Sequence, residues 1–229
     1  MVLAALADLV LPAECAGCRT PHVPLRRGAC ADCAASLAAL RPHAARPNPA
    51  PAGLPPCTAV GDYAGPLREA LLAYKERGRV TLATPLGTLL AEAVALAAGG
   101  VRRPVTLIPV PSTASAIRER HGDHMRRLAD RAARTLRRAG WPATVAQPLR
   151  ALPKPDHTHL DSAQRAIAAA AAFQPRRTRS RANGGAVVLV DDIVTTGATL
   201  AAVTAVLLRS GIPVDGAAVL AATRRRHPQ

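Results

Sequence analysis

The sequence predicts an α/β fold in which a mainly parallel central sheet is flanked by helices and preceded by a small cysteine-rich module. Three observations carry this prediction. Strand-like and helix-like segments alternate through residues 57–229, which is typical of parallel sheets. The segment 186–190 is continuously apolar, as expected of a central strand covered on both faces. Two Cys-x-x-Cys pairs precede a proline-rich stretch at 41–56.

The composition is that of a chain with a substantial core. Of its 229 residues, 49% are hydrophobic, which argues against disorder of the whole chain. The formal net charge of +15 favours contact with phosphates, on a nucleotide, a sugar phosphate or a nucleic acid. Solvated arginines without a specific role are the alternative interpretation. The few aromatic residues, which disfavour an aromatic stacking platform, are Tyr63, Tyr74, Trp141 and Phe173.

Composition also divides the chain into three parts. Residues 1–40 hold a short apolar helix, four of the five cysteines and a second apolar stretch. Residues 41–56 are rich in Pro and Ala and predict a semi-rigid extended linker. Residues 57–229 form the predicted α/β domain. Its expected strands are 57–63, 104–110, 144–149, 186–191 and 214–222, and its expected helices are 66–75, 80–98, 123–139, 161–172 and 197–210.

Apolar segments near the start and in the middle of the chain bear on its location. Residues 1–12 lack the cationic leader of a signal peptide, and Asp8 interrupts them. The stretch 81–98 contains Glu92 and a proline and falls short of the ~20 clean apolar residues of a membrane span. We therefore expect a cytoplasmic protein with no membrane span. The sequence predicts no particular oligomeric state.

The four cysteines of the first module have the spacing of a metal site. Cys15 and Cys18 form one Cys-x-x-Cys pair, and Cys30 and Cys33 form the other. Two such tight turns let four thiolates converge on one Zn²⁺ ion, which would stabilise a segment too short to fold alone. Disulfides are disfavoured without a signal peptide, and a redox pair would need no duplicate. Cys57 lies outside the pairs and is expected to be a buried free thiol.

A second motif follows the apolar strand at 186–190. Two acids, Asp191 and Asp192, stand at its carboxyl end, where ligands bind in open α/β sheets. The sequence Thr195-Thr-Gly-Ala-Thr199 then opens a helix, so backbone N–H groups, threonine hydroxyls and the helix dipole converge on one anion. The loop lacks the Gly-Lys-Ser/Thr of a nucleoside-triphosphate loop, which favours a monophosphate. A plain strand-turn-helix corner with incidental acids is the alternative.

Two acids followed by Thr-Thr-Gly-Ala-Thr resemble the signature of type I phosphoribosyltransferases, which use 5-phosphoribosyl 1-diphosphate (PRPP). The resemblance implies a type I phosphoribosyltransferase-like fold. It also implies that Mg²⁺ binds with PRPP, mainly through pyrophosphate and ribose oxygens. In this resemblance the 5′-phosphate is held by Thr195, Thr196, Gly197, Ala198 and Thr199, and the ribose hydroxyls are held by the catalytic acids Asp191 and Asp192.

The cysteine pairs in front of this signature make the chain similar to the ComF family, which joins an N-terminal zinc module to a phosphoribosyltransferase domain. The resemblance covers nearly the whole chain. It includes Tyr63-Ala-Gly-Pro66, Tyr74-Lys75 and Ile108-Pro-Val-Pro111. Family members commonly carry Arg-Gly-Phe-Asn-Gln where this chain has Arg120-His-Gly-Asp-His124, so the usual role of that loop is in question.

Basic side chains near these motifs are candidate partners for pyrophosphate, because the leaving group gathers negative charge during transfer. His124 and His157 are candidates to protonate or orient a leaving group. For each arginine the alternative is a solvent-exposed ion pair, and for each histidine it is a structural role. The candidate cations are Lys75, Arg118, Arg120 and Arg165.

Three functions remain open on the sequence. The first is a phosphoribosyltransferase, a pentosyl glycosyltransferase acting on an unidentified acceptor. The second, implied by the ComF resemblance, is a PRPP- or nucleotide-binding protein of DNA uptake in natural competence. Its basic helix 125–138 and the zinc module would contact single-stranded DNA or a helicase. The third is a regulator that keeps the fold without the chemistry.

Overall fold

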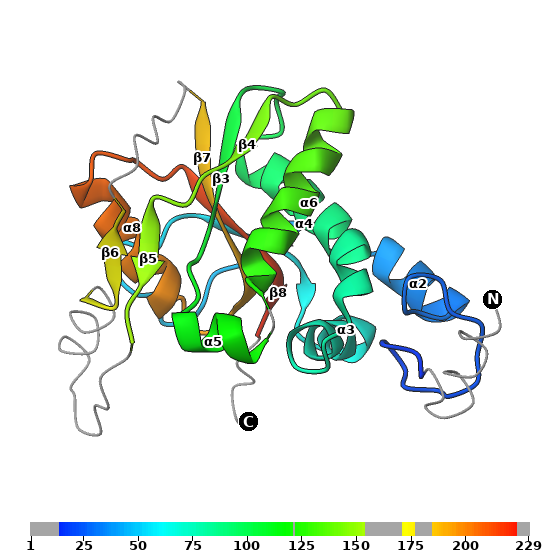
Figure 1. The fold of residues 1–229 in the computed structure, drawn as a ribbon. Coiled ribbons are helices and arrows are strands. Elements are labelled where there is room, and N and C mark those ends of the chain that lie inside the picture. Colours follow the sequence, from blue (N-terminus) through cyan, green and yellow to red (C-terminus); the bar gives the residue numbers. More distant parts are fainter. Residues whose placement is uncertain (1–13, 121, 154–170, 177–184, 224–229) are drawn as a thin grey trace.

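A computed structural model describes residues 14–120, 122–153, 171–176 and 185–223. Its centre is a six-stranded sheet in which four of the five strand pairings, β2–β8, β8–β7, β7–β3 and β3–β4, are parallel (Figure 1). The expected α/β fold with a mostly parallel sheet is therefore confirmed. In spatial order the strands are β1 (His43–Ala44), β2 (Cys57–Asp62), β8 (Gly216–Ala222), β7 (Ala186–Val194), β3 (Val105–Pro109) and β4 (Ala143–Val145).

Helices cover both faces of this sheet (Figure 1). On one face α4 (Ala83–Ala97) and α6 (His124–Arg138) pack against each other and against the even-numbered side chains of β7, such as Val188 and Val190. On the other face α8 (Ala198–Arg209) meets the odd-numbered ones, such as Leu189. The continuous apolar run of β7 follows from this arrangement, because successive side chains of a strand point to opposite faces and both are covered here.

The approach of α4 to α6 depends on a glycine. A Cβ atom at Gly87 would lie 2.4 Å from the Cβ of Arg131, so only a glycine allows this contact. The segment Val80–Ala97 also has the length and apolar composition of a membrane-crossing helix, with a mean hydropathy of 1.6. Half of it is buried, and α4 lies against the sheet and α6. In the structure it therefore serves as a core helix.

The predicted strand at 144–149 is wrong in its extent. β4 ends at Val145, and a separate strand, β5 (Leu149–Ala151), pairs with β6 (Phe173–Pro175) in a second, two-stranded sheet. Pro148 lies between β4 and β5 and has no N–H group for a ladder, which prevents one continuous strand. The predicted helix at 161–172 lies almost entirely outside the described residues.

The N-terminal module packs on the α/β domain. Its helix α2 (Ala31–Ala38) contributes Leu37 to the same buried cluster as Ala16 and the α3 helix (Gly65–Lys75). The guanidinium of Arg79, which follows α3, donates a hydrogen bond to the Glu14 carbonyl oxygen. The short helices η1 (Val80–Leu82) and α5 (Ala114–Glu119) complete the described elements.

The proline-rich residues 41–56 also contact the sheet. His43 and Ala44 form β1, which pairs antiparallel with β2. At the other end of the stretch, the carbonyl oxygen of Pro56 accepts a hydrogen bond from the amide of Ala217. These residues therefore add an edge strand to the sheet of the α/β domain.

Candidate functional site

The loop between β7 and α8 forms a small hollow that is open to solvent. Asp191, Ile193 and the residues from 194 to 200 line it. The side chains of Thr195, Thr196 and Thr199 are exposed to solvent. The first amides of a helix have no carbonyl partner within the helix, so those of α8 can donate to a group in this hollow.

Gly197 gives this loop its shape. Its φ angle of 77° places it in the left-handed region, which glycine adopts without the strain that a Cβ atom brings. It is the N-cap of α8 and accepts the first helical hydrogen bond, from the amide of Ala201 at 2.9 Å. The hydroxyl of Thr196 accepts from the amide of Ala198 at 3.4 Å. The sequence thus folds locally into the strand-turn-helix corner that the motif predicts.

The two acids of the motif point to opposite faces of the sheet. Asp191 lies with the phosphate-loop candidates, and its Oδ1 accepts a hydrogen bond from the amide of Asp192 at 2.9 Å. Asp192 points to the face covered by α3 and α6. Its Oδ2 lies 2.6 Å from Nζ of Lys75 and 3.5 Å from Nε2 of His124. The structure therefore brings Lys75 to Asp192. Of the two acids, Asp191 is the one that borders the hollow.

These environments shift the two carboxyl groups in opposite directions. Burial, and after it the negative charge of Asp192, raises the pKa of Asp191 well above its ordinary range. Burial alone would also raise the pKa of Asp192, but hydrogen bonding to His124 and the charge of Lys75 outweigh it and lower that pKa. Adjacent acids with opposite shifts are a frequent feature of functional sites.

His124 and Tyr74 form part of the surroundings of Asp192. His124 is the first residue of α6, and only 7% of it is exposed. The Tyr74 hydroxyl donates to the carbonyl oxygen of His124 at 2.9 Å, and burial raises the pKa of Tyr74 to about 12. Sequence reasoning singled out His124 for its chemistry but gave Tyr74 no role. The sequence feature that could have pointed to Tyr74 is its position next to Lys75.

The remaining predicted cations are less closely tied to the hollow. Arg118 is exposed on α5, and Arg120, the C-cap of that helix, is half-buried. α5 follows the carboxyl end of β3, which is the same edge of the parallel sheet as the carboxyl end of β7. Arg165 and His157 lie outside the described residues.

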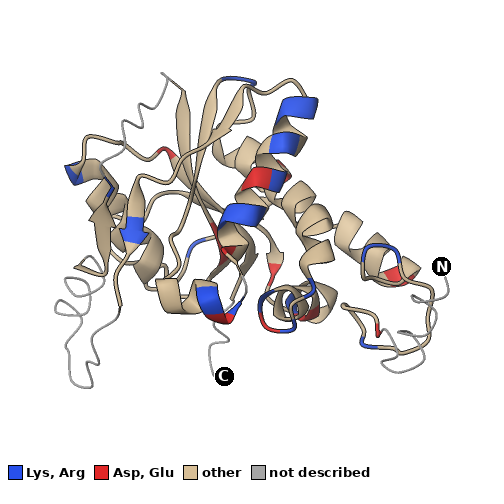
Figure 2. Cartoon of the chain, in the orientation of Figure 1, with Lys and Arg blue, Asp and Glu red and all other residues tan. Residues whose placement is uncertain are grey.

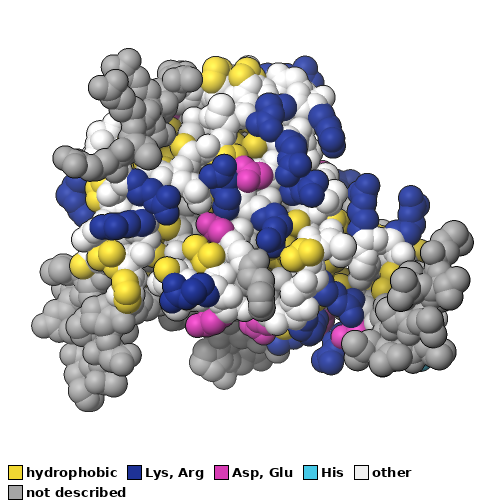
Figure 3. Space-filling view, in the orientation of Figure 1, with side chains coloured by type: hydrophobic (Ala, Val, Ile, Leu, Met, Phe, Trp, Pro, Cys, Tyr) yellow, Lys and Arg dark blue, Asp and Glu magenta, His cyan; other side chains and the backbone are white. Residues whose placement is uncertain are grey.

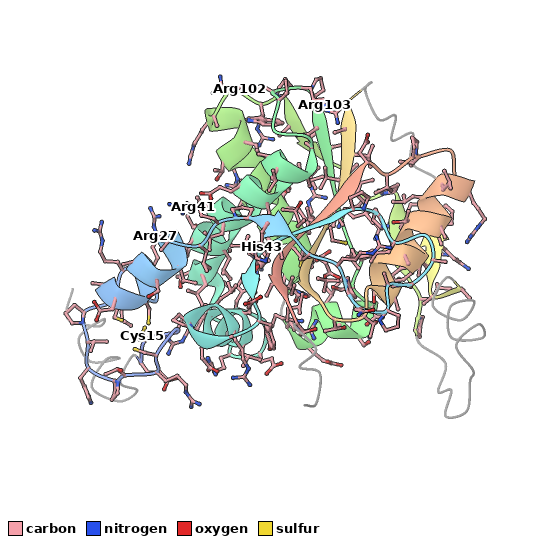
Figure 4. The ribbon with its side chains drawn as sticks, turned by 180° about the vertical axis from the view of Figure 1, so that it is seen from behind. Cys15, Arg27, Arg41, His43, Arg102 and Arg103 are labelled. Atoms are coloured by element: carbon pink, nitrogen blue, oxygen red, sulfur yellow. The ribbon has the colours of Figure 1, made fainter. Side chains whose placement is uncertain are left out.

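The four predicted cysteine ligands come together in the N-terminal module. Their sulfur atoms all lie within 4.8 Å of one another, and Sγ of Cys18 is 3.9 Å from Sγ of Cys30. A tetrahedral Zn²⁺ site with Zn–S bonds of about 2.3 Å places its sulfurs roughly 3.8 Å apart. The cluster, which includes Cys15 (labelled in Figure 4) and Cys33, therefore has the dimensions to hold a zinc ion.

The pKa values of the thiols in this cluster are shifted in different directions. Burial would raise the pKa of Cys15, but hydrogen bonds from backbone amides, including those of Gly17 and Cys30, outweigh it and lower the pKa to about 6. Hydrogen bonding to Thr20 lowers the pKa of Cys18. Burial and the neighbouring thiols raise the pKa of Cys33. A divalent cation would favour the thiolate at all four positions.

Cys57 is separate from this cluster. It is buried at the start of β2, and its thiol donates to the carbonyl oxygen of Pro55 at 3.2 Å. Burial raises its pKa to about 11. These properties agree with the expected buried free thiol.

Arginines gather along α6, and they are also spread over other parts of the surface. Figure 2 shows the basic residues along this helix, and Figure 3 shows basic side chains over the same part of the surface. Several make internal contacts: Arg126 pairs with Asp130 at 2.9 Å, and Arg137 donates to the Ala143 carbonyl oxygen at 2.8 Å. Figure 4 places Arg27 within the N-terminal module and Arg102 near the amino end of β3.

No protein-family model matches the chain, and no curated protein matches it. The structure has an α/β fold with a mostly parallel sheet and a four-cysteine cluster with the dimensions to hold a zinc ion.

Proposed function

We propose that this chain binds the 5′-phosphate of a phosphoribosyl compound, PRPP or a nucleotide, in the loop Thr195–Thr199. The observation that carries the proposal is the corner between β7 and α8, where the left-handed Gly197 turns the chain beside the open hollow. Backbone amides, the hydroxyls of exposed threonines and the positive end of a 12-residue helix converge there. This donor set suits a phosphate group without requiring a cationic side chain.

Asp191 supports the ribose part of this proposal. Asp191 lies in β7, four residues before Thr195, and borders the hollow on the strand side. A carboxylate in this position can accept hydrogen bonds from two vicinal hydroxyls. Mg²⁺ bound with PRPP would be held mainly by oxygens of the ligand, as a hard cation that keeps few protein ligands.

Asp192 has a different role in this proposal from the one implied by the family resemblance. Its Oδ2 is already paired with Lys75, on the opposite face of β7 from the hollow. The pair would fix the end of β7 to α3 and α6, and so hold Asp191 in place. Lys75 would act through Asp192 rather than as a free partner for pyrophosphate.

In its enzymatic form, the proposal is a phosphoribosyltransferase of ComF type. An acceptor nucleophile would bond to the ribose C1 while the C1–O bond to pyrophosphate breaks, and the electron pair leaves with pyrophosphate. In this form of the proposal, Arg118 and Arg120, which follow β3 at the same edge of the sheet, would meet that charge. The four-cysteine cluster would hold one structural Zn²⁺ ion, and a cytoplasmic location belongs to the same proposal.

Ligand binding by the purified chain tests the proposal. Titration with ribose 5-phosphate, and with PRPP and Mg²⁺, should give saturable binding that Thr199→Val weakens by about ten- to a hundredfold, since a hydrogen bond to a charged group contributes roughly 1.5–3 kcal/mol. Thr88→Val is the matched control, an exposed threonine on α4. Absence of binding by the wild-type chain, or equal loss in both variants, would refute the proposal. Release of pyrophosphate with a base or nucleoside would establish the enzymatic form.

A non-catalytic protein of DNA uptake is the second candidate, and the basic surface of α6 favours it (Figure 3). Arg134, Arg137 and Arg138 are exposed on this helix. Single-stranded DNA bound there would dissociate with rising salt, because phosphate contacts release counterions. Replacing Arg134 and Arg138 with Gln should reduce such binding, and Arg209→Gln, on the far helix α8, should not. A regulator without catalytic activity would bind PRPP and release no pyrophosphate.

A further inference from the structure

The proline-rich residues 45–56 form a closed loop that reaches the phosphate-loop candidate. The amide of Ala45 donates to the carbonyl oxygen of Cys57 at 2.9 Å, which joins the two ends of the loop. Loops of this size with adjacent ends are often packed by their own side chains and frequently functional. In Figure 4 the chain after His43 runs from the sheet edge toward α8. We call residues 45–56 the backing loop.

Two side chains of the backing loop lie against Gly197. A Cβ atom built on Gly197 would lie 2.9 Å from Cδ1 of Leu54 and 3.4 Å from Cγ of Pro47. Leu54 is half-buried and packs against the apolar cluster that contains Val194 and Leu200, the residues that flank the turn. The turn therefore has the hollow on one side and the backing loop on the other.

The backbone conformation of this turn depends on such support. Glycine adopts left-handed and right-handed conformations with similar ease, so contacts from its surroundings help to hold Gly197 in the left-handed state. Leu54 and Pro47 fill the space behind the Cα atom of Gly197 and leave no room for the turn to relax inward.

We propose that Leu54 is a positioning residue for the phosphate loop. It does not line the hollow, and it acts by holding Gly197 so that the amides and hydroxyls of residues 195–199 are arranged before a phosphate binds. Binding sites arranged in advance lose less conformational entropy on association and bind more tightly. This inference rests on the proposed phosphate site, and it assigns a role in that site to a segment that the sequence suggests is only a linker.

The test compares Leu54→Ala with two other variants. Leu54→Met keeps the volume of the side chain and should retain binding. Ile212→Ala removes packing from the same apolar cluster near the opposite end of α8, and so reproduces a loss of stability without touching Gly197. Ribose 5-phosphate affinity should fall about tenfold in Leu54→Ala, because residues 195–199 are no longer preorganised for the phosphate. The affinity should remain unchanged in Ile212→Ala and Leu54→Met.

A second measurement separates this inference from the proposed function. Hydrogen exchange of the amides in residues 195–200 of the ligand-free protein should be faster in Leu54→Ala than in Ile212→Ala. Unchanged exchange in Leu54→Ala overturns the inference even if no ligand binds the wild-type chain. If the wild-type chain binds ribose 5-phosphate and Leu54→Ala binds it equally well, the inference fails while the proposed function stands.

Discussion

The ion pair between Lys75 and Asp192 gives the sharpest quantitative prediction about this site. Lys75→Met removes the cation and keeps most of the apolar stem. The side chain of Asp192 is only 8% exposed, so the variant leaves a buried carboxylate with His124 at 3.5 Å as its remaining partner. Breaking a buried ion pair from one side costs about 3–5 kcal/mol. The Lys75 side chain is 23% exposed, which places the expected loss of unfolding free energy near the lower end, about 3 kcal/mol.

A second substitution isolates the charge as the cause. Asp192→Asn in the Lys75→Met background removes the unpaired charge with little change of shape, and should recover about 1–2 kcal/mol of that loss. Urea unfolding measures these differences, and the single tryptophan, Trp141, reports them by fluorescence because only 7% of it is exposed in the folded chain. Equal stability of the wild type and Lys75→Met, or no recovery in the double variant, would refute the described arrangement.

The pH dependence of this effect has a definite sign. The pKa of Asp192 is lowered in the folded chain, so its pairing stabilises the fold above the ordinary Asp pKa of about 3.9. That stabilisation is lost as the pH falls through the lowered folded-state value. The stability difference between the wild type and Lys75→Met should therefore shrink in acid, and a difference that stays constant would contradict the assignment of the charge effect to Asp192.

Four other predictions follow from the described contacts. Gly197→Ala should destabilise the chain by about 1–2 kcal/mol, since φ is 77° and Leu54 leaves no space, and should weaken ribose 5-phosphate binding in calorimetry. Tyr74→Phe removes the hydrogen bond to the His124 carbonyl oxygen and should cost about 1 kcal/mol in urea unfolding; no change would show that this bond is dispensable. Cys33→Ser should abolish binding of about one zinc per chain in metal analysis, and retained zinc would contradict the four-ligand site. Because the pKa of Asp191 is raised, ribose 5-phosphate affinity should increase with pH as the Asp191 carboxylate forms. Asp191→Asn should lack that part of the increase. Identical pH profiles of the wild type and the variant would show that this carboxylate takes no part in binding.

Local sequence patterns were sufficient for most of the described elements. The run 186–190 predicted a strand covered on both faces, and the structure places β7 between β8 and β3 with helices on either side. The amphipathic pattern after Asp123 predicted α6, and Asp123 caps that helix by accepting from the amide of Arg126 at 2.9 Å. Such signals succeed because apolar periodicity and capping act over a few neighbouring residues.

The residues of the candidate site were found more readily than their arrangement. Sequence reasoning identified the two acids and Lys75, but treated both acids as one ribose-binding pair. The structure turns them to opposite faces, because both belong to β7, which extends to Val194, and successive side chains of a strand alternate. The two carboxyl groups point apart because β7 continues past both of them to Val194. The apolar run ends at residue 190, so the sequence did not show that the strand includes the two acids.

The sequence by itself determined the alternation of strands and helices, the strand-turn-helix corner at Gly197 and the four-cysteine pattern, because each depends on residues close together along the chain. Tertiary structure alone decided that Lys75 meets Asp192 and that Leu54 backs Gly197. Those pairs are far apart in sequence, and their contacts depend on how distant segments pack around one sheet. Local patterns carry no record of that packing, since many partners of similar size and charge would satisfy them equally.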